Sequence, residues 1–307
     1  MTDNIIKICL ACDDNYATYA GVVIASILAN AQKEEVLKFY ILDGGIKNKH
    51  KFQILQLKNI KDCEIEFIPI NEDLFKDYKE VKTHSYVTLA TYYRLKLPTL
   101  LPNIDRIIYF DCDFVVNSSL KELYNIDLEG CPIAGVHDIK QKMVIKNPTY
   151  VNAGMLLFDI KRMKELNLEQ RFLEWAQENL AEITCGDQEI INEACKGQIK
   201  ILDKEWNVQS SNFTNRSCYI KKPKGIHFVS KKKPWQFASY SYHKKYYFKY
   251  LQLTPWAHNK WQHFLWNYIN EIASIICYIG YRPLFLFRPK FYRAFYYTYI
   301  EPILRRA

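Results

Sequence analysis

The sequence predicts an open α/β sheet, and three observations support that prediction. Apolar runs of strand length alternate with helical patterns along residues 1–205. The 307 residues are 49% hydrophobic, which is enough to bury a substantial core. No internal repeat or Gly/Ser-rich linker divides residues 1–235. We therefore expect these residues to form one domain, whose strands are joined by right-handed crossovers and bind a ligand at their carboxyl ends.

The first five elements form a strand, helix, strand, helix, strand series. Branched residues fill the first apolar run, and Val22, Val23, Ser26 and Ile27 repeat at helical spacing. The predicted elements are a strand over 5–12, a helix over 19–29, a strand over 37–42, a helix over 47–58 and a strand over 64–69. This order predicts parallel pairing of the strands.

The alternation continues less regularly after residue 100. The expected elements are strands over 106–110, 133–136 and 155–159, and helices over 161–181 and 187–194. Beyond residue 235 the character of the chain changes, because the apolar residues between 256 and 279 fall three or four positions apart. We expect a helix over 256–279 with one apolar side.

Charged and aromatic residues divide the chain near residue 215. Residues 1–215 carry 25 basic and 31 acidic side chains, whereas residues 216–307 carry 17 basic and 2 acidic ones. The second group also holds 25 of the 46 aromatic residues. The chain is therefore a slightly acidic body with a strongly basic, aromatic C-terminal region, and the acidic body disfavours binding of a polyanion.

The cysteines and the apolar runs indicate a cytoplasmic protein. Nine scattered cysteines lack the even spacing of a disulfide framework, which favours a reducing compartment. Cys9 and Cys12 form an isolated C-x-x-C within a predicted strand and are interpreted as structural. The first residues lack the basic segment and cleavage site of a signal peptide. The longest uncharged apolar run, 272–281, is shorter than the roughly 20 residues of a spanning helix.

Two aspartates follow the strand predicted over 106–110. Side chains at positions i and i+2 of an extended chain point the same way, so Asp111 and Asp113 can present their oxygens to one small volume. A hard divalent cation, Mg²⁺ or Mn²⁺, would relieve the repulsion between them. A solvated turn after the strand is the alternative.

A second acidic pair follows the first predicted strand, in the segment Asp13-Asp14-Asn15-Tyr16. At the ligand edge of the sheet, its acceptor oxygens could bind the donor edge of a nucleobase, with Tyr16 available for stacking. The alternative is an N-cap for the next helix, which contributes about 1 kcal/mol.

Basic residues and a histidine lie further along the chain. Lys231, Lys232 and Lys233, beside a proline and Trp235, could hold a diphosphate. His227 could be a neutral imidazole ligand to the same cation. A solvated lysine loop and a structural histidine are the alternatives.

Six motifs occur in one order: LACDDNYA (10–17), TYYRLKL (91–97), YFDCD (109–113), YVNAG (150–154), DQ (187–188) and HFVSKKKPW (227–235). Together they resemble the retaining family-8 glycosyltransferases, and most nearly the bacterial lipooligosaccharide and lipopolysaccharide galactosyl- and glucosyltransferases. The resemblance implies a single GT-A-like (Rossmann-like) nucleotide-sugar-binding domain with a mixed central sheet over residues 1–235. It also implies a small basic, aromatic, helical region over 236–307 that associates with membrane.

The resemblance implies roles for individual residues. Asp111, Asp113 and His227 would hold Mn²⁺, or Mg²⁺, against the diphosphate of a UDP-sugar. The implied catalytic residues are Gln188, Asp187 and Asp138, with Gln188 beneath the anomeric carbon. The residues implied for binding the UDP-sugar are Asp13, Asp14, Asn15, Tyr16, Arg94, Asp111, Cys112, Asn152, Ala153, Ser230 and Lys233. Ser230 departs from the family, which has glycine at that position, and its side chain would alter the loop that approaches the phosphates.

The implied function is Mn²⁺-dependent transfer of a hexose, galactose or glucose, from a UDP-sugar to a lipooligosaccharide or lipopolysaccharide core acceptor. The family implies retention of the anomeric configuration. Gln188 is neutral and a poor nucleophile, which favours front-side attack by the acceptor hydroxyl. A double displacement, or a base, supplied by Asp187 or Asp138 stays open.

The C-terminal region 236–307 suggests where the acceptor is found. Its interleaved basic and aromatic residues suit peripheral attachment to the inner face of the cytoplasmic membrane, at roughly 1 kcal/mol per basic residue near an anionic surface. Two alternatives stay open. The region could bind nucleic acid, which would make the protein a nucleotide- or nucleic-acid-binding module, or it could be an ordinary helical subdomain.

Overall fold

A computed structural model of the chain describes residues 5–78, 89–139, 146–180, 183–211, 220–229, 233–236, 239, 241 and 243–257. Beyond its first two residues, the helix predicted over 256–279 lies outside the described residues, as does most of the basic region. Contacts divide the chain into two compact units, residues 1–208 with 220–227 and residues 209–219 with 228–307. The domain boundary expected at residue 235 stays a prediction.

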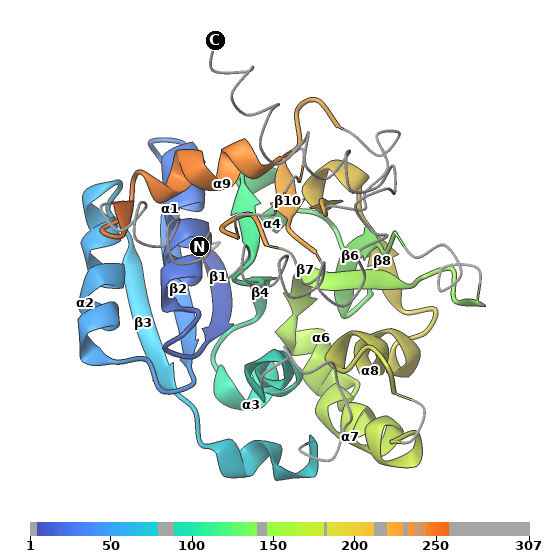
Figure 1. Cartoon of the computed structure of the whole chain (residues 1–307). Helices are drawn as coiled ribbons and strands as arrows, with labels where there is room; N and C mark the ends of the chain where they lie inside the picture. The colour runs from blue at the N-terminus through green and yellow to red at the C-terminus, as the bar shows by residue number, and fades with distance from the viewer. Residues whose placement is uncertain are drawn as a thin grey trace, which may run out of the picture. The chain divides into compact units, whose positions relative to one another are not determined.

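The first unit contains a mixed seven-stranded sheet in the order β3-β2-β1-β4-β7-β6-β8 (Figure 1). Its strands are β1 (Ile5–Cys12), β2 (Val36–Asp43), β3 (Glu64–Pro69), β4 (Arg106–Phe110), β6 (Ile133–His137), β7 (Val151–Asp159) and β8 (Ile199–Ile201). The pairs β1–β2, β2–β3, β1–β4 and β6–β8 are parallel, whereas β7 runs antiparallel to β4 and β6. The expected mixed α/β sheet is confirmed, and β1, β3 and β4 begin and end at the predicted residues.

The order of strands reverses at β1. Strands β2 and β3 lie on one side of β1, and β4 lies on the other. In an open α/β sheet, ligands bind outside the carboxyl ends of the strands at such a reversal. The topology therefore favours a ligand site at the ends of β1 and β4, next to Cys12 and Phe110.

The middle strands form the core of this sheet. All residues of β7 except its last are buried, and Ile8, Cys9 and Leu10 of β1 are fully buried. Strands covered on both faces read as continuous apolar runs rather than as alternating ones, which is the pattern of these segments. A rigid centre of this kind holds the polar residues at its strand ends in fixed positions.

The α-helices of the first unit are α1 (Ala17–Asn30), α2 (Asn48–Leu55), α3 (Leu97–Leu100), α4 (Lys121–Tyr124), α6 (Ile160–Glu165), α7 (Leu168–Glu178) and α8 (Asp187–Ala194). Its 3₁₀ helices are η1 (Gln56–Asn59), η2 (Glu72–Tyr78), η3 (Leu89–Lys96) and η4 (Lys204–Trp206). Helix α8 matches the predicted segment and packs against α7 and β7 (Figure 1).

Two predicted helices differ from the observed ones. The single helix expected over 161–181 is wrong, because α6 and α7 are separated at Asn167, whose φ of 50° is left-handed. Asparagine tolerates this conformation better than most residues, so the first helix ends there. The segment predicted as a helix over 47–58 is α-helical only to Leu55 and continues as 3₁₀ helix to Asn59.

A second, three-stranded sheet in the order β5-β10-β9 positions one more site residue. Strand β5 (Phe114–Val116) begins directly after Asp113, and β9 spans Val208–Gln209. Strand β10 (Gly225–His227) pairs antiparallel with β5, so that His227 lies opposite Phe114. This register brings His227 next to Asp113.

The second unit contains helix α9 (Lys244–Leu251). The ring of Tyr247 lies 5.2 Å from that of Trp235 and 6.3 Å from that of Phe228, between centroids. The hydroxyl of Ser210 lies 2.6 Å from that of Ser241 and 3.0 Å from His243 Nδ1. Within the described ranges of the chain, no helix combines the length and the apolar character needed to cross a membrane.

Candidate functional site

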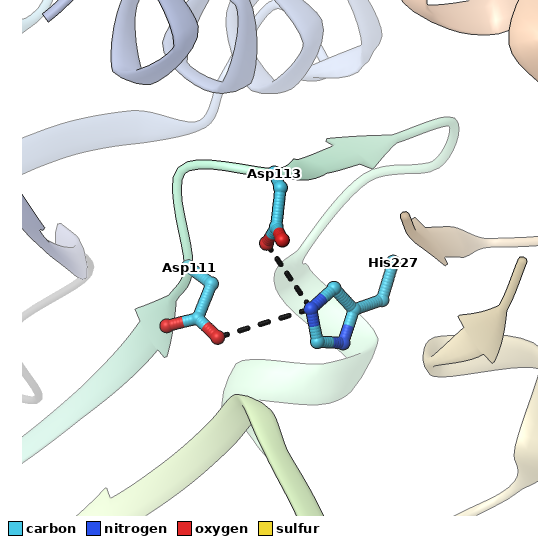
Figure 2. A group of neighbouring side chains, drawn as sticks. All are labelled: Asp111, Asp113 and His227. Atoms are coloured by element: carbon cyan, nitrogen blue, oxygen red, sulfur yellow. Dashed lines mark ion pairs between the residues drawn. The ribbon is translucent and has the colours of Figure 1, made fainter. Parts of the chain in front are cut away.

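Three side chains converge beyond the end of β4. Asp111 extends the pairing of β4 with β7, since its backbone N–H donates to Gly154 O at 2.9 Å, and Asp113 precedes β5. His227 reaches them from the end of β10. One ligand atom from each of Asp111, Asp113 and His227 lies within 4.8 Å of the other two. Figure 2 shows the imidazole facing both carboxylates.

The distances within this cluster suit a cation. His227 Nε2 lies 3.1 Å from Asp113 Oδ1 and 3.8 Å from Asp111 Oδ2 (Figure 2). The side chain of His227 is 7% exposed, whereas those of Asp113 and Asp111 are 14% and 29% exposed and so reach solvent. Two carboxylates and an imidazole form a donor set that Mn²⁺ and Mg²⁺ accept. The predicted residues therefore fit a divalent cation.

A buried arginine links this cluster to α8. Arg94 Nη2 donates to Asp111 Oδ1 at 2.6 Å, Nη1 donates to the carbonyl of Ala153, and Nε lies 3.0 Å from Asp187 Oδ2. The guanidinium also stacks over the ring of Tyr109, 4.1 Å from its centroid. Burial raises the pKa of Asp187, although the charge of Arg94 opposes that shift. Arg94 thus balances two carboxylates inside the protein.

Side-chain amides link the end of β6, the beginning of β7 and the first turn of α8. Gln188, in the first turn of α8, accepts from the backbone N–H of Ala153 and from Asn152 Nδ2, both at 3.1 Å, through Oε1. Its Nε2 donates to Asp138 Oδ2 at 3.1 Å, and Asn152 Nδ2 lies 3.3 Å from the same oxygen. Asp138, Asn152 and Gln188 are therefore brought together, as predicted, with fixed orientations.

The turn between β1 and α1 uses its carboxylates differently. Asp13 Oδ1 accepts from the backbone N–H of Tyr16 at 3.0 Å, in the turn before α1. The N-cap residue of α1 is Tyr16 and no side chain caps the helix, so the capping alternative is wrong. Asp14 accepts from Lys47 N at 2.9 Å and lies 2.7 Å from His50 Nδ1. Partial burial of Asp14 raises its pKa, but hydrogen bonds from Lys47 and His50 outweigh it and lower the pKa to about 2. Asn15 is exposed.

The aromatic residue of that turn lies near the acidic pair of β4. The ring of Tyr16 packs edge-on against Tyr19 at 5.5 Å between centroids. Burial, together with the negative charge of Asp113, raises the pKa of the Tyr16 hydroxyl to about 12. The first and second acidic turns are thus electrostatic neighbours, as the switch point of the sheet predicts.

The remaining predicted residues have other surroundings. Cys112 Sγ donates to Ala11 O at 3.3 Å, and a hydrogen bond with Cys12 together with burial raises the pKa of Cys112 well above its usual value. In the second unit, Lys233 Nζ donates to Phe228 O at 2.9 Å. Ser230 lies outside the described residues, so its contact with UDP stays a prediction.

Three residues beside the site were not predicted. The hydroxyl of Thr91 donates to Asp187 Oδ1 at 2.8 Å, and Tyr109 lies beneath Arg94. Thr91 lies in the motif over 91–97 and Tyr109 in the motif over 109–113, so the sequence motifs could have indicated both residues. Asn207 Nδ2 donates to Asn152 Oδ1 at 3.0 Å, and nothing in the pattern around Asn207 pointed to this contact.

Known proteins resemble this chain in sequence and fold. The family model for glycosyl transferase family 8 matches residues 7–239. A glycosyltransferase of Haemophilus influenzae is 35% identical over 66% of this chain, which spans 63% of that protein. The lipopolysaccharide 1,2-glucosyltransferase of Escherichia coli is 25% identical over 91% of both chains. A crystal structure of the galactosyltransferase LgtC with donor and acceptor sugar analogs has a TM-score of 0.71 at 23% identity, covering 81% of this chain and 96% of that one. The mixed sheet is therefore a GT-A fold.

Proposed function

The chain belongs to glycosyl transferase family 8, and on that premise we propose that it moves galactose or glucose from a UDP-sugar to a lipooligosaccharide or lipopolysaccharide core acceptor, with retention of the anomeric configuration. The observation that supports this most directly is the cluster of Asp111, Asp113 and His227 beside the switch point of the sheet. A divalent cation at this edge of the sheet suits the diphosphate of a nucleotide.

The proposed cation is Mn²⁺, with Mg²⁺ as a substitute, held by Asp111, Asp113 and His227. When bound, it would stabilise the negative charge that develops on the departing diphosphate. Asp111 keeps one oxygen on Arg94, so its other oxygen is the one left toward His227. Lys233 and Ser230 would contact the phosphates, and Asp13, Asp14, Asn15 and Tyr16 would bind uridine.

The orientation of Gln188 bears on the reaction course. Its Oε1 already accepts from Ala153 N and Asn152 Nδ2, and an amide oxygen engaged in this way is a weak nucleophile. This supports attack by the acceptor hydroxyl from the face that the diphosphate leaves. Asp187 and Asp138 would position the hexose rather than attack it, because Arg94 and Thr91 hold the first and two amides hold the second.

The proposed acceptor and location follow from relatives and from charge. The lipopolysaccharide 1,2-glucosyltransferase relative supports a lipid-linked oligosaccharide core as acceptor. In α9, the exposed side chain of Lys245 lies over the half-buried ring of Tyr246, 5.3 Å from its centroid. Such paired basic and aromatic groups suit the interface of an anionic membrane. We infer peripheral attachment to the inner face of the cytoplasmic membrane through region 236–307.

A donor panel tests the enzymatic proposal. The purified protein is given UDP-galactose, UDP-glucose and their N-acetyl forms, and release of UDP is measured with Mn²⁺, with Mg²⁺ and with EDTA. We expect one unmodified hexose donor to be preferred, EDTA to remove turnover, and Mn²⁺ to restore it. Equal turnover with EDTA would contradict the metal assignment, and turnover of no UDP-hexose would contradict the donor.

Attachment to membrane has its own test. Flotation with vesicles that contain anionic lipid is compared with flotation on neutral vesicles and with binding to a single-stranded oligonucleotide. We expect flotation on anionic vesicles that weakens as salt rises, because exposed charges are screened over about 10 Å at 0.1 M salt. Tight oligonucleotide binding without flotation would favour the nucleic-acid-binding alternative.

A further inference from the structure

Asn207 lies one residue beyond η4 and is 2% exposed. We propose that Asn207 is a positioning residue. Through the side-chain oxygen of Asn152, it holds His227 in the tautomer whose Nε2 lone pair faces Asp111 and Asp113. The inference rests on the proposed function, because it concerns the same cation site.

The side-chain oxygen of Asn152 is the centre of this arrangement. It receives the backbone N–H of Gly154 at 3.1 Å, Asn207 Nδ2 at 3.0 Å and His227 Nδ1 at 2.8 Å. A backbone N–H can only donate, so the atom that faces Gly154 must be the oxygen of the Asn152 amide.

The opposite end of the Asn152 amide leads to the same orientation. Its Nδ2 faces Gln188 Oε1 at 3.1 Å and Asp138 Oδ2 at 3.3 Å. Gln188 Oε1 is itself identified by the backbone N–H of Ala153, which donates to it at 3.1 Å. Two backbone N–H groups therefore fix both amides, and an exchanged orientation of Asn152 would set donor against donor.

The proton position on His227 follows from this orientation. A carbonyl oxygen accepts only, so Nδ1 carries the proton in the neutral imidazole and Nε2 carries the lone pair. It is Nε2 that lies 3.1 Å from Asp113 Oδ1. A metal-binding histidine is commonly fixed in this way by the hydrogen bond of its other ring nitrogen.

Sterics hold the ring from a second direction. A Cβ atom added to Gly154 would lie 2.1 Å from His227 Cε1, which no side chain could occupy with the ring in place. The imidazole thus packs directly against the backbone of β7 at Gly154, which leaves it little room to move.

The contacts of Asn207 indicate that its role is to support the side-chain oxygen of Asn152. Its Nδ2 donates to Asn152 Oδ1, while its Oδ1 has no hydrogen-bond partner among the described residues. A buried amide with one unmet acceptor is unfavourable unless its other bond is needed. That one bond supports the acceptor on which His227 depends.

The test is Asn207→Asp, which keeps the shape of the side chain but removes the donor. The new carboxylate would set an acceptor against Asn152 Oδ1, whose orientation the backbone N–H of Gly154 keeps, so the Asn152 side chain would shift and its bond to His227 Nδ1 would weaken. Titration calorimetry of the full chain with Mn²⁺ alone should then show a Kd about 10- to 100-fold higher. In ¹⁵N-histidine NMR spectra of the Mg²⁺-loaded protein, the Nδ1 signal of His227 should move away from the shift of the wild type, because its hydrogen bond to Asn152 is weakened.

Two further variants keep the result interpretable. Asn147→Asp changes another buried asparagine of the same unit, whose side chain donates to Asn192 O at 3.0 Å and accepts from Thr149. It should leave the Mn²⁺ Kd within twofold. Asn207→Ala removes the donor without adding charge and should raise the Kd in the same direction, by less. If Asn207→Asp does not fold, the Asn207→Ala variant decides.

The outcomes separate the inference from the function that it rests on. Wild-type binding of Mn²⁺ together with an unchanged Kd and an unchanged His227 Nδ1 signal in both Asn207 variants would overturn the inference and leave the proposed function standing. A wild-type chain that binds no Mn²⁺ would overturn the metal assignment, and with it the inference.

Discussion

The turn after β1 and the turn after β4 both carry an acidic pair, at the same edge of one sheet, yet they use it in opposite ways. In the first turn, Asp13 bonds the N–H of Tyr16, and Asp14 bonds Lys47 and His50, so the protein itself supplies the donors. In the second turn, Arg94 bonds one oxygen of Asp111, while Asp111 Oδ2 and Asp113 Oδ1 face His227 Nε2. A carboxylate that follows a strand is therefore bound by the protein's own donors or faces a candidate cation site, according to what the rest of the fold places opposite it.

The largest expected effect is the loss of transfer in Asp113→Ala. If the second turn holds the cation, removing a ligand should lower kcat/KM by about 10³-fold, since electrostatic stabilisation by a metal contributes several kcal/mol and each 1.36 kcal/mol is tenfold. The assay is UDP-hexose turnover with saturating Mn²⁺, with the melting temperature as a check of folding. Asp127→Ala, an exposed aspartate that accepts from Glu129 N, is the matched control. Equal activity of the two variants would remove the distinction between the turns.

The next largest effect concerns the arginine that only the second turn possesses. Arg94→Met leaves Asp111 and Asp187 without their buried partner and should lower the free energy of unfolding by about 3–5 kcal/mol. Urea denaturation measures this. Arg162→Met breaks an exposed pair with Glu165 at 2.9 Å and should cost less than about 1 kcal/mol. A similar loss in both variants would show that burial of Arg94 adds nothing.

The smallest effect is expected in the first turn. Asp14→Asn should lower the free energy of unfolding by about 1 kcal/mol at neutral pH, because the carboxylate is partly solvated and its bonds are screened. The folded pKa of Asp14, about 2, lies below its unfolded value of about 3.9, so this contribution is complete above pH 4 and is lost as pH falls toward 2. Denaturation of both proteins between pH 2 and 7 checks it. A difference that persists at pH 2 would point to lost packing instead of lost charge.

Much of the fold could be predicted from local patterns. Strands β1, β3 and β4 are apolar runs ended by polar residues, and their limits match the prediction. The direction of each strand was harder to predict, because a buried strand such as β7 has the same composition whether it runs parallel or antiparallel to its neighbours. The break at Asn167 was missed because one residue in a left-handed conformation hardly disturbs the apolar spacing of 161–181.

Some residues of the candidate site could likewise be predicted from local patterns, and others could not. Asp111 and Asp113 follow from the two-residue period of a strand. For His227 the residues alone left a ligand and a structural histidine both open, because its place depends on the pairing of β10 with β5. Asn207 gave no signal, because the hydrogen bond from its side chain to Asn152 joins segments far apart in the chain. Sequence patterns predict which groups reach an edge of the sheet, and tertiary pairing decides which groups meet there.

The pairing of β5 with β10 also sets when the cation cluster can exist. Asp113 directly precedes β5, and His227 is the last residue of β10. The loop between these two distant strands must therefore close before the three side chains can meet. An unfolded chain therefore offers no comparable site, and a cation that binds the cluster raises the free energy of unfolding in proportion to the logarithm of its concentration. Thermal melting at increasing Mn²⁺ would thus follow assembly of the two distant strands as well as occupancy of the site.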